Sequence, residues 1–293
     1  MSSRINDDHE KRYMPSEWSK RGNHEAVVEQ FVKICEDAAD TAKTSTQCSL
    51  DVPYGDTKLA KFDIYGNELP QDAPIIIFIH GGYWTEMDKN HGAVLVTSAI
   101  PNGIKVISIG YDLCPDVTIS EIISQIRTAV EKVIKSASAA RCRKVWIVGH
   151  SAGAHLAASV LYNKSWMDRI MAQYPSTLKG LVLIGGIYNL RPLLTTSVNA
   201  DLKLTEEDVV TYSFGSIDIE PIQGIRAIVV VGECDSPQFV DESRMYAQKL
   251  VTILDNVQFV LLRDNIDHFD IVERLIDPKF VLTKIMLEAV SSD

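Results

Sequence analysis

The 293-residue sequence lacks the features of several large protein classes. Its longest apolar runs, such as 75–79, are far too short to span a membrane. It has no excess of positive charge, because 29 Lys and Arg residues against 39 Asp and Glu residues give a net charge of −10. Such a surface repels nucleic acid. We therefore expect the partner to be a small-molecule substrate, with neither a membrane nor a nucleic acid involved.

Cysteine is scarce and irregularly spaced. The five cysteines form no C-x-x-C pair, and no Cys/His group has the spacing of a zinc site. A chain of this length needs no disulfides for stability, so reduced thiols in a cytoplasmic protein are the simplest interpretation. The first residues are polar and lack the apolar stretch of a signal peptide. We therefore expect a cytoplasmic protein without a metal site.

Short apolar runs that alternate with helical segments predict the fold class. The runs look buried on both faces and lie at residues 75–79, 104–109, 145–148, 181–184, 227–231 and 257–262. The helical segments are 119–137, 152–161 and 243–250. This alternation is typical of an α/β protein with a mostly parallel central sheet and helices on both faces.

The two remaining regions predict additions to that sheet. Residues 25–42 have helical spacing, and strands at 47–52 and 58–64 flank the turn Tyr54-Gly55-Asp56, as in an N-terminal β-hairpin. The stretch 188–224 is longer and less regular, so we interpret it as a cap region over the site. No linker divides the sequence, and we expect residues 1–293 to form one domain.

A candidate nucleophile lies between a strand and a helix. Gly149-His150-Ser151-Ala152-Gly153 matches G-x-S-x-G, directly after one predicted strand and directly before a predicted helix. That setting makes a sharp elbow that exposes a serine hydroxyl, and the following helix aims its amides at a developing oxyanion. The alternative is a surface turn with an incidental serine. We predict that Ser151 is the catalytic nucleophile.

A second motif predicts the oxyanion hole. His80-Gly81-Gly82-Tyr83-Trp84 follows the strand at 75–79, as the HGG loop does in esterase-like α/β hydrolases. We assign the amide donors to Gly82 and Ala152, with Gly81 and Tyr83 as helpers. His80 is interpreted as a brace for the loop. Trp84 fits a pocket wall and the core equally well.

The order of the chain identifies the base. In this fold the nucleophile is followed by an acid and then by a histidine. Only His155 and His268 follow Ser151. His155 lies one helical turn after the serine and cannot turn to face its hydroxyl, so His268 is the predicted base.

The acid is expected in the loop after the strand at 227–231. Catalytic groups of open α/β sheets gather at the carboxyl ends of the strands. That loop contains Asp235, which we choose as the acid, and Glu233, which stays the alternative. Asp267 is too close to His268 in sequence to be the usual partner. Asp235 would hold the imidazole in the required tautomer.

These residues resemble the kynurenine formamidase (arylformamidase) family of the α/β-hydrolase superfamily over nearly the whole chain. The HGG loop and the elbow are common to many hydrolases, whereas the N-terminal and Asp-Ser-Pro motifs are narrower. The shared segments are Tyr13-x-Pro15-Ser16-x-Trp18, Val52-Pro53-Tyr54-Gly55-Asp56, Asp63-Ile64-Tyr65, His80 to Trp84, Gly149 to Ala158, Asp235-Ser236-Pro237-x-Phe239 and Asp267-His268-Phe269-x-Ile271-Val272-Glu273. The segment 189–224 matches less clearly.

The resemblance implies hydrolysis of N-formyl-L-kynurenine to L-kynurenine and formate, without a metal or cofactor, by a cytosolic and often homodimeric protein. An aromatic substrate suits an aromatic pocket, for which Tyr83, Trp84, Tyr188, Phe239 and Phe269 are candidates, although each also suits the core. Two alternatives stay open. One is a carboxylesterase for small esters with the same triad, and the other is a non-catalytic binding protein on this fold.

Overall fold

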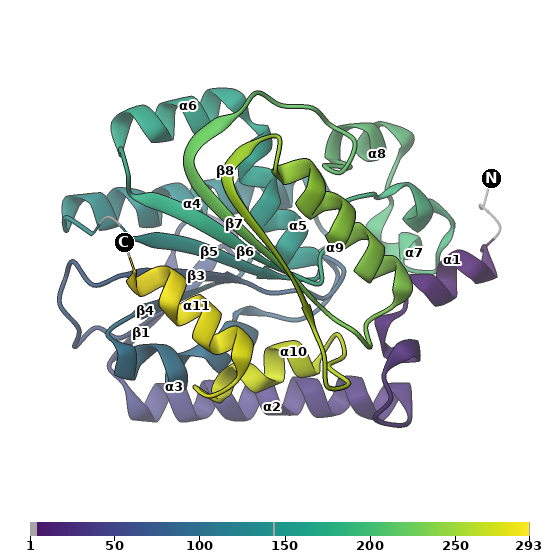
Figure 1. Ribbon diagram of the computed structural model, residues 1–293, viewed down its shortest axis with the longest axis horizontal. Helices are drawn as coiled ribbons and strands as arrows, with labels where there is room; N and C mark the ends of the chain where they lie inside the picture. Colours follow the sequence, from purple (N-terminus) through teal and green to yellow (C-terminus); the bar gives the residue numbers. More distant parts are fainter. Residues whose placement is uncertain (1–4, 143, 293) are drawn as a thin grey trace.

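An eight-stranded sheet forms the centre of the computed structural model, which describes residues 5–142 and 144–292 (Figure 1). The strands lie in the order β1-β2-β4-β3-β5-β6-β7-β8. Their bounds are Cys48–Pro53, Lys61–Tyr65, Ile75–Ile79, Lys105–Ile109, Val145–His150, Leu178–Ile184, Ile222–Gly232 and Leu254–Leu262 for β1 to β8. β1, β2 and β4 pair antiparallel, and every pairing from β4 through β3 to β8 is parallel. The predicted α/β class and N-terminal hairpin are confirmed.

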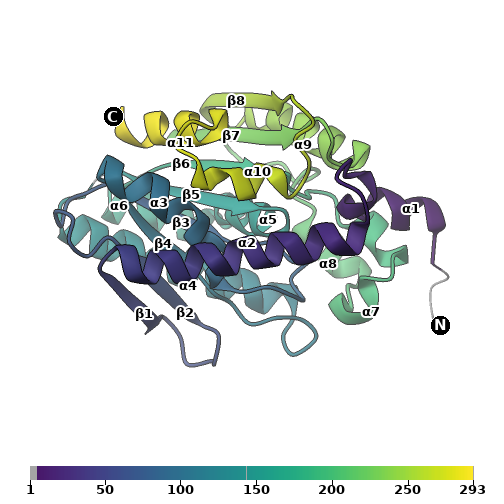
Figure 2. The ribbon, with the colours of Figure 1, turned by 90° about the horizontal axis from the view of Figure 1, so that it is seen from below.

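Helices cover both faces of this sheet. Successive side chains of a strand point to opposite faces, so each face carries apolar side chains that pack into a core of its own. On β3, Ile75, Ile77 and Ile79 belong to one core, and Ile76 and Phe78 belong to the other. Figures 1 and 2 show the second face covered by α2 (His24–Ser45), α3 (Val96–Ala99), α10 (Asp270–Glu273) and α11 (Val281–Ser291). The first face carries α4 (Ile119–Ala139), α5 (Ala152–Ser159), α6 (Lys164–Gln173) and α9 (Pro237–Leu250).

Local sequence signals set the ends of the longer helices. Asn23 accepts a hydrogen bond from the amide of Glu25 at the start of α2. Thr118 and Glu121 form a reciprocal capping box at the start of α4. Both devices satisfy backbone N–H groups that the first helical turn leaves without a partner.

The last strand corrects one expectation. Residues 257–262 were expected to be buried on both faces, but Phe259 and Leu261 of β8 are 38% and 42% exposed. β8 lies at the edge of the sheet, next to β7 alone. An edge strand has a neighbour on one side only, so its apolar side chains are covered less completely than those of β3 or β5.

The irregular stretch 188–224 lies beside the N-terminal segment. It contains the 3₁₀ helix η5 (Arg191–Thr195), α7 (Asn199–Leu202) and α8 (Glu206–Tyr212). The N-terminal helix α1 (Asp7–Arg12) lies near α7 in both views of the ribbon (Figures 1 and 2). The Asn6 amide donates to the Thr195 carbonyl at 2.8 Å, and Glu10 accepts from the Ser197 amide at 2.7 Å. Residues 195 and 197 of the predicted cap are thus joined to the start of the chain.

No helix among residues 5–142 and 144–292 combines the length and the apolar composition that a membrane crossing requires.

Candidate active site

The nucleophile elbow connects β5 to α5. Ser151 has φ 55° and ψ −121°, a conformation that non-glycine residues rarely adopt and that functional sites retain. The following helix approaches the end of β3 so closely that a Cβ on Gly153 would lie 2.1 Å from the Ile79 carbonyl oxygen. Only glycine fits there, which explains the second glycine of the motif. Ser151 itself is 3% exposed and lines the pocket described below.

The HGG loop places backbone amides beside that serine. The Gly82 carbonyl accepts from the amides of Thr85 and Glu86 at 2.9 Å, so a tight turn follows the glycine. Tyr83 and Trp84 both have positive φ, 48° and 61°, which curls the loop over the pocket. Gly82 lines the pocket with Ser151, and Ala152 is the first residue of α5. The amides of Gly82 and Ala152 are therefore suited to an oxyanion.

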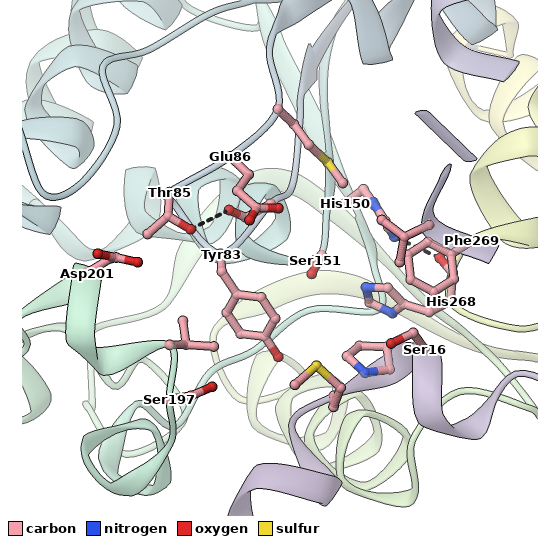
Figure 3. Close-up of a pocket in the computed structure, with 16 residues that line it drawn as sticks. Ser16, Tyr83, Thr85, Glu86, His150, Ser151, Ser197, Asp201, His268 and Phe269 are labelled. Carbon is pink, nitrogen blue, oxygen red and sulfur yellow. Dashed lines mark hydrogen bonds between the residues drawn. The ribbon is translucent and has the colours of Figure 1, made fainter. Parts of the chain in front are cut away.

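His268 and Asp235 meet at the carboxyl ends of β8 and β7. His268 Nδ1 donates to Asp235 Oδ2 at 2.7 Å, and both side chains are buried. Asp235 Oδ1 also accepts from the Ser236 amide at 2.7 Å. With the proton of the imidazole on Nδ1, Nε2 is free to accept the serine proton. Figure 3 shows the Ser151 hydroxyl beside the His268 ring, and both line one pocket.

The alternative acid lies elsewhere. Glu233 pairs with Arg263 at 2.9 Å and accepts from the Asn265 amide at the same distance, on the protein surface. Asp267 accepts from Arg21 and Ser19. The geometry therefore favours Asp235, and the roles of Ser151, His268 and Asp235 remain our proposal.

Two residues beside the pair were not predicted from the sequence. His150 Nε2 donates to the backbone carbonyl of His268 at 2.9 Å, and the two rings are 4.6 Å apart. Burial, followed by the neighbouring His268, lowers the pKa of His150 well below its ordinary value. A neutral His150 adds no second positive charge when His268 is protonated. Gly185 follows β6, and a Cβ there would lie 3.1 Å from both Asp235 Oδ2 and His268 Nδ1.

The remaining histidines near the site have structural environments. His80 is buried, stacks on Tyr111 at 4.2 Å and lies with Nδ1 2.8 Å from the Gly81 carbonyl oxygen, as expected of a brace. Burial lowers its pKa to about 3. His155 points into the core, where Nε2 donates to the Tyr212 carbonyl at 2.9 Å. Among the described residues, no cluster of His, Cys, Asp and Glu could hold a metal ion.

A cavity of about 470 Å³ opens above Ser151. Besides the elbow and the His268 loop, its walls are formed by residues 14–16, helix α2, the HGG loop with the residues after it, and the predicted cap. The residues that complete the walls are Met14, Pro15, Ser16, Val28, Thr85, Glu86, Met87, Ser197, Val198 and Asp201. The contribution of residues 14–16 was not predicted, because nothing in their spacing indicates that they return to the sheet edge.

The aromatic candidates divide into two groups. Tyr83 and Phe269 line the cavity. The structure does not bring Trp84, Tyr188 or Phe239 to its walls, and we assign these three side chains to the core. Trp84 packs edge-on against His155, Tyr188 stacks on Tyr246 at 3.7 Å, and the Phe239 ring lies 4.9 Å from His268. These three rings are at most 1% exposed, and the cavity is completed largely by smaller polar residues and methionines.

Comparison with known proteins agrees with this architecture. The BD-FAE family model matches residues 62–213, which is more than half of the chain. Kynurenine formamidase of Danio rerio is 34% identical over 291 residues, covering 97% of this chain and 96% of that protein. The corresponding protein of Salmo salar is 33% identical over 290 residues, covering 96% and 95%. A putative thioesterase of Silicibacter sp. TM1040 has a TM-score of 0.75 at 26% identity, covering 96% and 98%.

Fold and site together define a serine hydrolase of the α/β-hydrolase fold. Within that class, the chain belongs to the kynurenine formamidase family.

Replacement of either proposed catalytic residue should abolish turnover. Ser151→Ala and His268→Ala are each expected to lower kcat for p-nitrophenyl acetate by at least about a thousandfold, and the double variant should be no worse, because the residues act as one unit. Ser159→Ala is the matched control, since this buried serine lies on α5 and donates to Leu156. Near-normal rates in either single variant would show that the triad assignment is wrong.

The buried His155 should make stability depend on pH. Burial lowers its pKa in the folded state to about 4, while the unfolded chain titrates near 6.5. Below pH 6.5 the unfolded state binds the extra proton, so folded stability is lost as pH falls towards 4. His155→Gln keeps a donor for the Tyr212 carbonyl and removes this titration. Its unfolding free energy should fall less than that of the wild type between pH 6.5 and 5, by about 2 kcal/mol.

Urea denaturation at several pH values measures this difference. His24→Gln is the control, because His24 lies exposed at the start of α2 and should leave the pH dependence of the wild type intact. An identical pH dependence in His155→Gln and the wild type would contradict the account of His155.

Proposed function

We propose that the protein hydrolyses N-formyl-L-kynurenine to L-kynurenine and formate, a step of tryptophan breakdown. The observation that carries this proposal is the similarity to kynurenine formamidases along nearly the whole chain. The site supplies the chemistry that this reaction needs, namely a nucleophile, a base with an orienting acid, and amides for an oxyanion.

The reaction proceeds through a covalent intermediate. His268 Nε2 takes the proton of Ser151 as the hydroxyl oxygen attacks the formyl carbon, and the oxyanion is held by the amides of Gly82 and Ala152. When the C–N bond breaks, His268 gives the proton to the leaving aryl amine, and formyl-serine remains. Water, deprotonated by the same imidazole, then attacks the formyl carbon. The bond from that carbon to Ser151 Oγ breaks, His268 returns the proton to Oγ, and formate leaves. Asp235 stabilises the imidazolium in both halves of the cycle.

The cavity suits a large leaving group. The formyl group is the smallest acyl group, so most of the binding surface must contact the aromatic amine and its amino-acid tail. Tyr83, Phe269, Met14 and Met87 supply aromatic and thioether surface next to Ser151. Such surface suits the aryl ketone of the substrate.

The polar wall of the cavity is acidic. Glu86 and Asp201 are exposed carboxylates of the lining, and no Lys or Arg is among the described residues that line this cavity. Figure 3 shows Asp201 on the side of Tyr83 that is away from His268. The α-ammonium group of the substrate would therefore be oriented towards these carboxylates, and the α-carboxylate towards solvent.

Neutralising this wall should weaken substrate binding and leave the chemical step intact. Asp201→Asn and Glu86→Gln are each expected to raise KM for formylkynurenine about twofold to fivefold, the effect of one exposed ion pair, with little change in kcat. KM for p-nitrophenyl acetate should not change, since that ester has no ammonium group. Glu207→Gln, an exposed residue of α8 outside the cavity, is the matched control. Equal KM values in all variants would contradict the proposed orientation.

The second candidate is a carboxylesterase for small esters. The same triad would serve it, and esterases share this fold, including one of Pyrobaculum calidifontis with a TM-score of 0.67 at 19% identity. A side-by-side measurement of kcat/KM on formylkynurenine and on p-nitrophenyl acetate separates the two functions. We expect the formamide to be the better substrate. Turnover of the ester alone would contradict the proposed function.

Two further parts of the proposal concern the setting of the enzyme. We propose a cytoplasmic location, which the five free cysteines of the structure support. We also propose a homodimer, on the basis of the family resemblance. Cell fractionation and light scattering of the purified protein test these two points.

A further inference from the structure

The N-terminal segment is attached to both loops that carry the proposed acid and base. At one end, the Ser236 hydroxyl donates to the Arg12 carbonyl, beside Asp235. At the other end, Arg21 reaches Asp267, the residue before His268. In between, the Tyr83 hydroxyl of the HGG loop donates to the Tyr13 carbonyl. Residues 12–21 therefore contact all three loops that meet at Ser151.

The contact at Asp267 is the most extensive of these. Its buried carboxylate accepts from the Ser19 hydroxyl at 2.5 Å and from Arg21 Nε at 2.9 Å. It also accepts from the amides of Phe269 at 2.8 Å and Asp270 at 2.7 Å, which start the turn containing His268. The Asp267 carboxylate thus fixes the backbone that follows His268, whereas β8 precedes it.

Arg21 compensates the buried charge of that carboxylate. Its guanidinium binds Asp267 on one edge and Glu273 of α10 on the other, with Nη1 to Oε2 at 2.7 Å and Nη2 to Oε1 at 3.1 Å. Although burial opposes it, the bond from Ser19, the Asp270 amide and the charge of Arg21 hold the pKa of Asp267 below its ordinary value. Without Arg21, two carboxylates beside the His268 loop would lack their shared cation.

We infer that Arg21 is a positioning residue of this hydrolase, which holds His268 in register with Ser151 through the carboxylate of Asp267. The choice of formylkynurenine as a substrate rests on the proposed function. The role of Arg21 does not depend on that choice, because any acyl transfer at Ser151 needs the same placement of His268. A displacement of about 1 Å at the base costs about a hundredfold in rate. Arg21 does not line the cavity, so its effect acts on kcat more than on KM.

The test measures kcat and KM of Arg21→Ala and Arg21→Lys, per mole of folded protein, on formylkynurenine and on p-nitrophenyl acetate. Arg21→Ala should lose about a hundredfold in kcat, with a smaller change in KM. Arg21→Lys keeps the charge but cannot bind Asp267 and Glu273 with two edges of a guanidinium, so it should recover only part of kcat. Arg169→Ala is the control: it removes an exposed arginine of α6 that binds Glu131 of α4, and it should change neither kcat nor KM.

The outcomes separate this inference from the proposed function. An Arg21→Ala protein with the kcat of the wild type overturns the inference. So does a loss of rate that disappears when kcat is expressed per mole of folded protein, or a change in KM as large as the change in kcat. If Arg21→Ala does not fold, an Arg21→Lys protein with the kcat of the wild type overturns it instead. A wild type that hydrolyses only the ester refutes the proposed substrate, and the ester data still decide the role of Arg21.

Discussion

The hydrogen bond between Asp235 and His268 is the interaction on which the rest of the site depends. It joins the loops after β7 and β8 and leaves Nε2 of the ring available towards Ser151. Both groups are buried, so the bond acts with little competition from water. Gly185 leaves space for this bond because it has no side chain, and the His150 side chain donates a hydrogen bond to the backbone carbonyl of His268. The sheet edge therefore presents a base that is already oriented for proton transfer.

A second constraint is that the site is completed by segments far from it in sequence. The parallel sheet brings the proposed nucleophile, acid and base to one edge, but it supplies only part of the cavity wall. Residues 14–16 and the α7 region close the cavity from parts of the chain that are far apart in sequence, and α1 contacts the residues before α7. A binding cavity made in this way can be shaped for its leaving group while the catalytic loops stay fixed.

The sequence predicted the sheet, because strands follow from local patterns, and local patterns also supplied the catalytic candidates. Continuous apolar runs identify strands, and G-x-S-x-G after such a run identifies Ser151. Chain order then leaves His268, and the structure brings Asp235 to it. The sequence did not predict which aromatic rings face the cavity. Tyr188, Phe239 and Phe269 are all buried and have similar local signals, and only the three-dimensional structure shows that Phe269 alone of the three lines the cavity.

The same reasoning explains why the N-terminal contacts were missed. Arg21 and Asp267 are 246 residues apart, and no periodic pattern records a pairing at that separation. The central claim is that Ser151 is a nucleophile activated by a histidine brought from the far end of the chain. The most direct measurement is peptide mapping after reaction with a fluorophosphonate probe. The account predicts a single label on Ser151 that is lost when the protein is unfolded before reaction, and a label on another residue, or none on the folded protein, would contradict it.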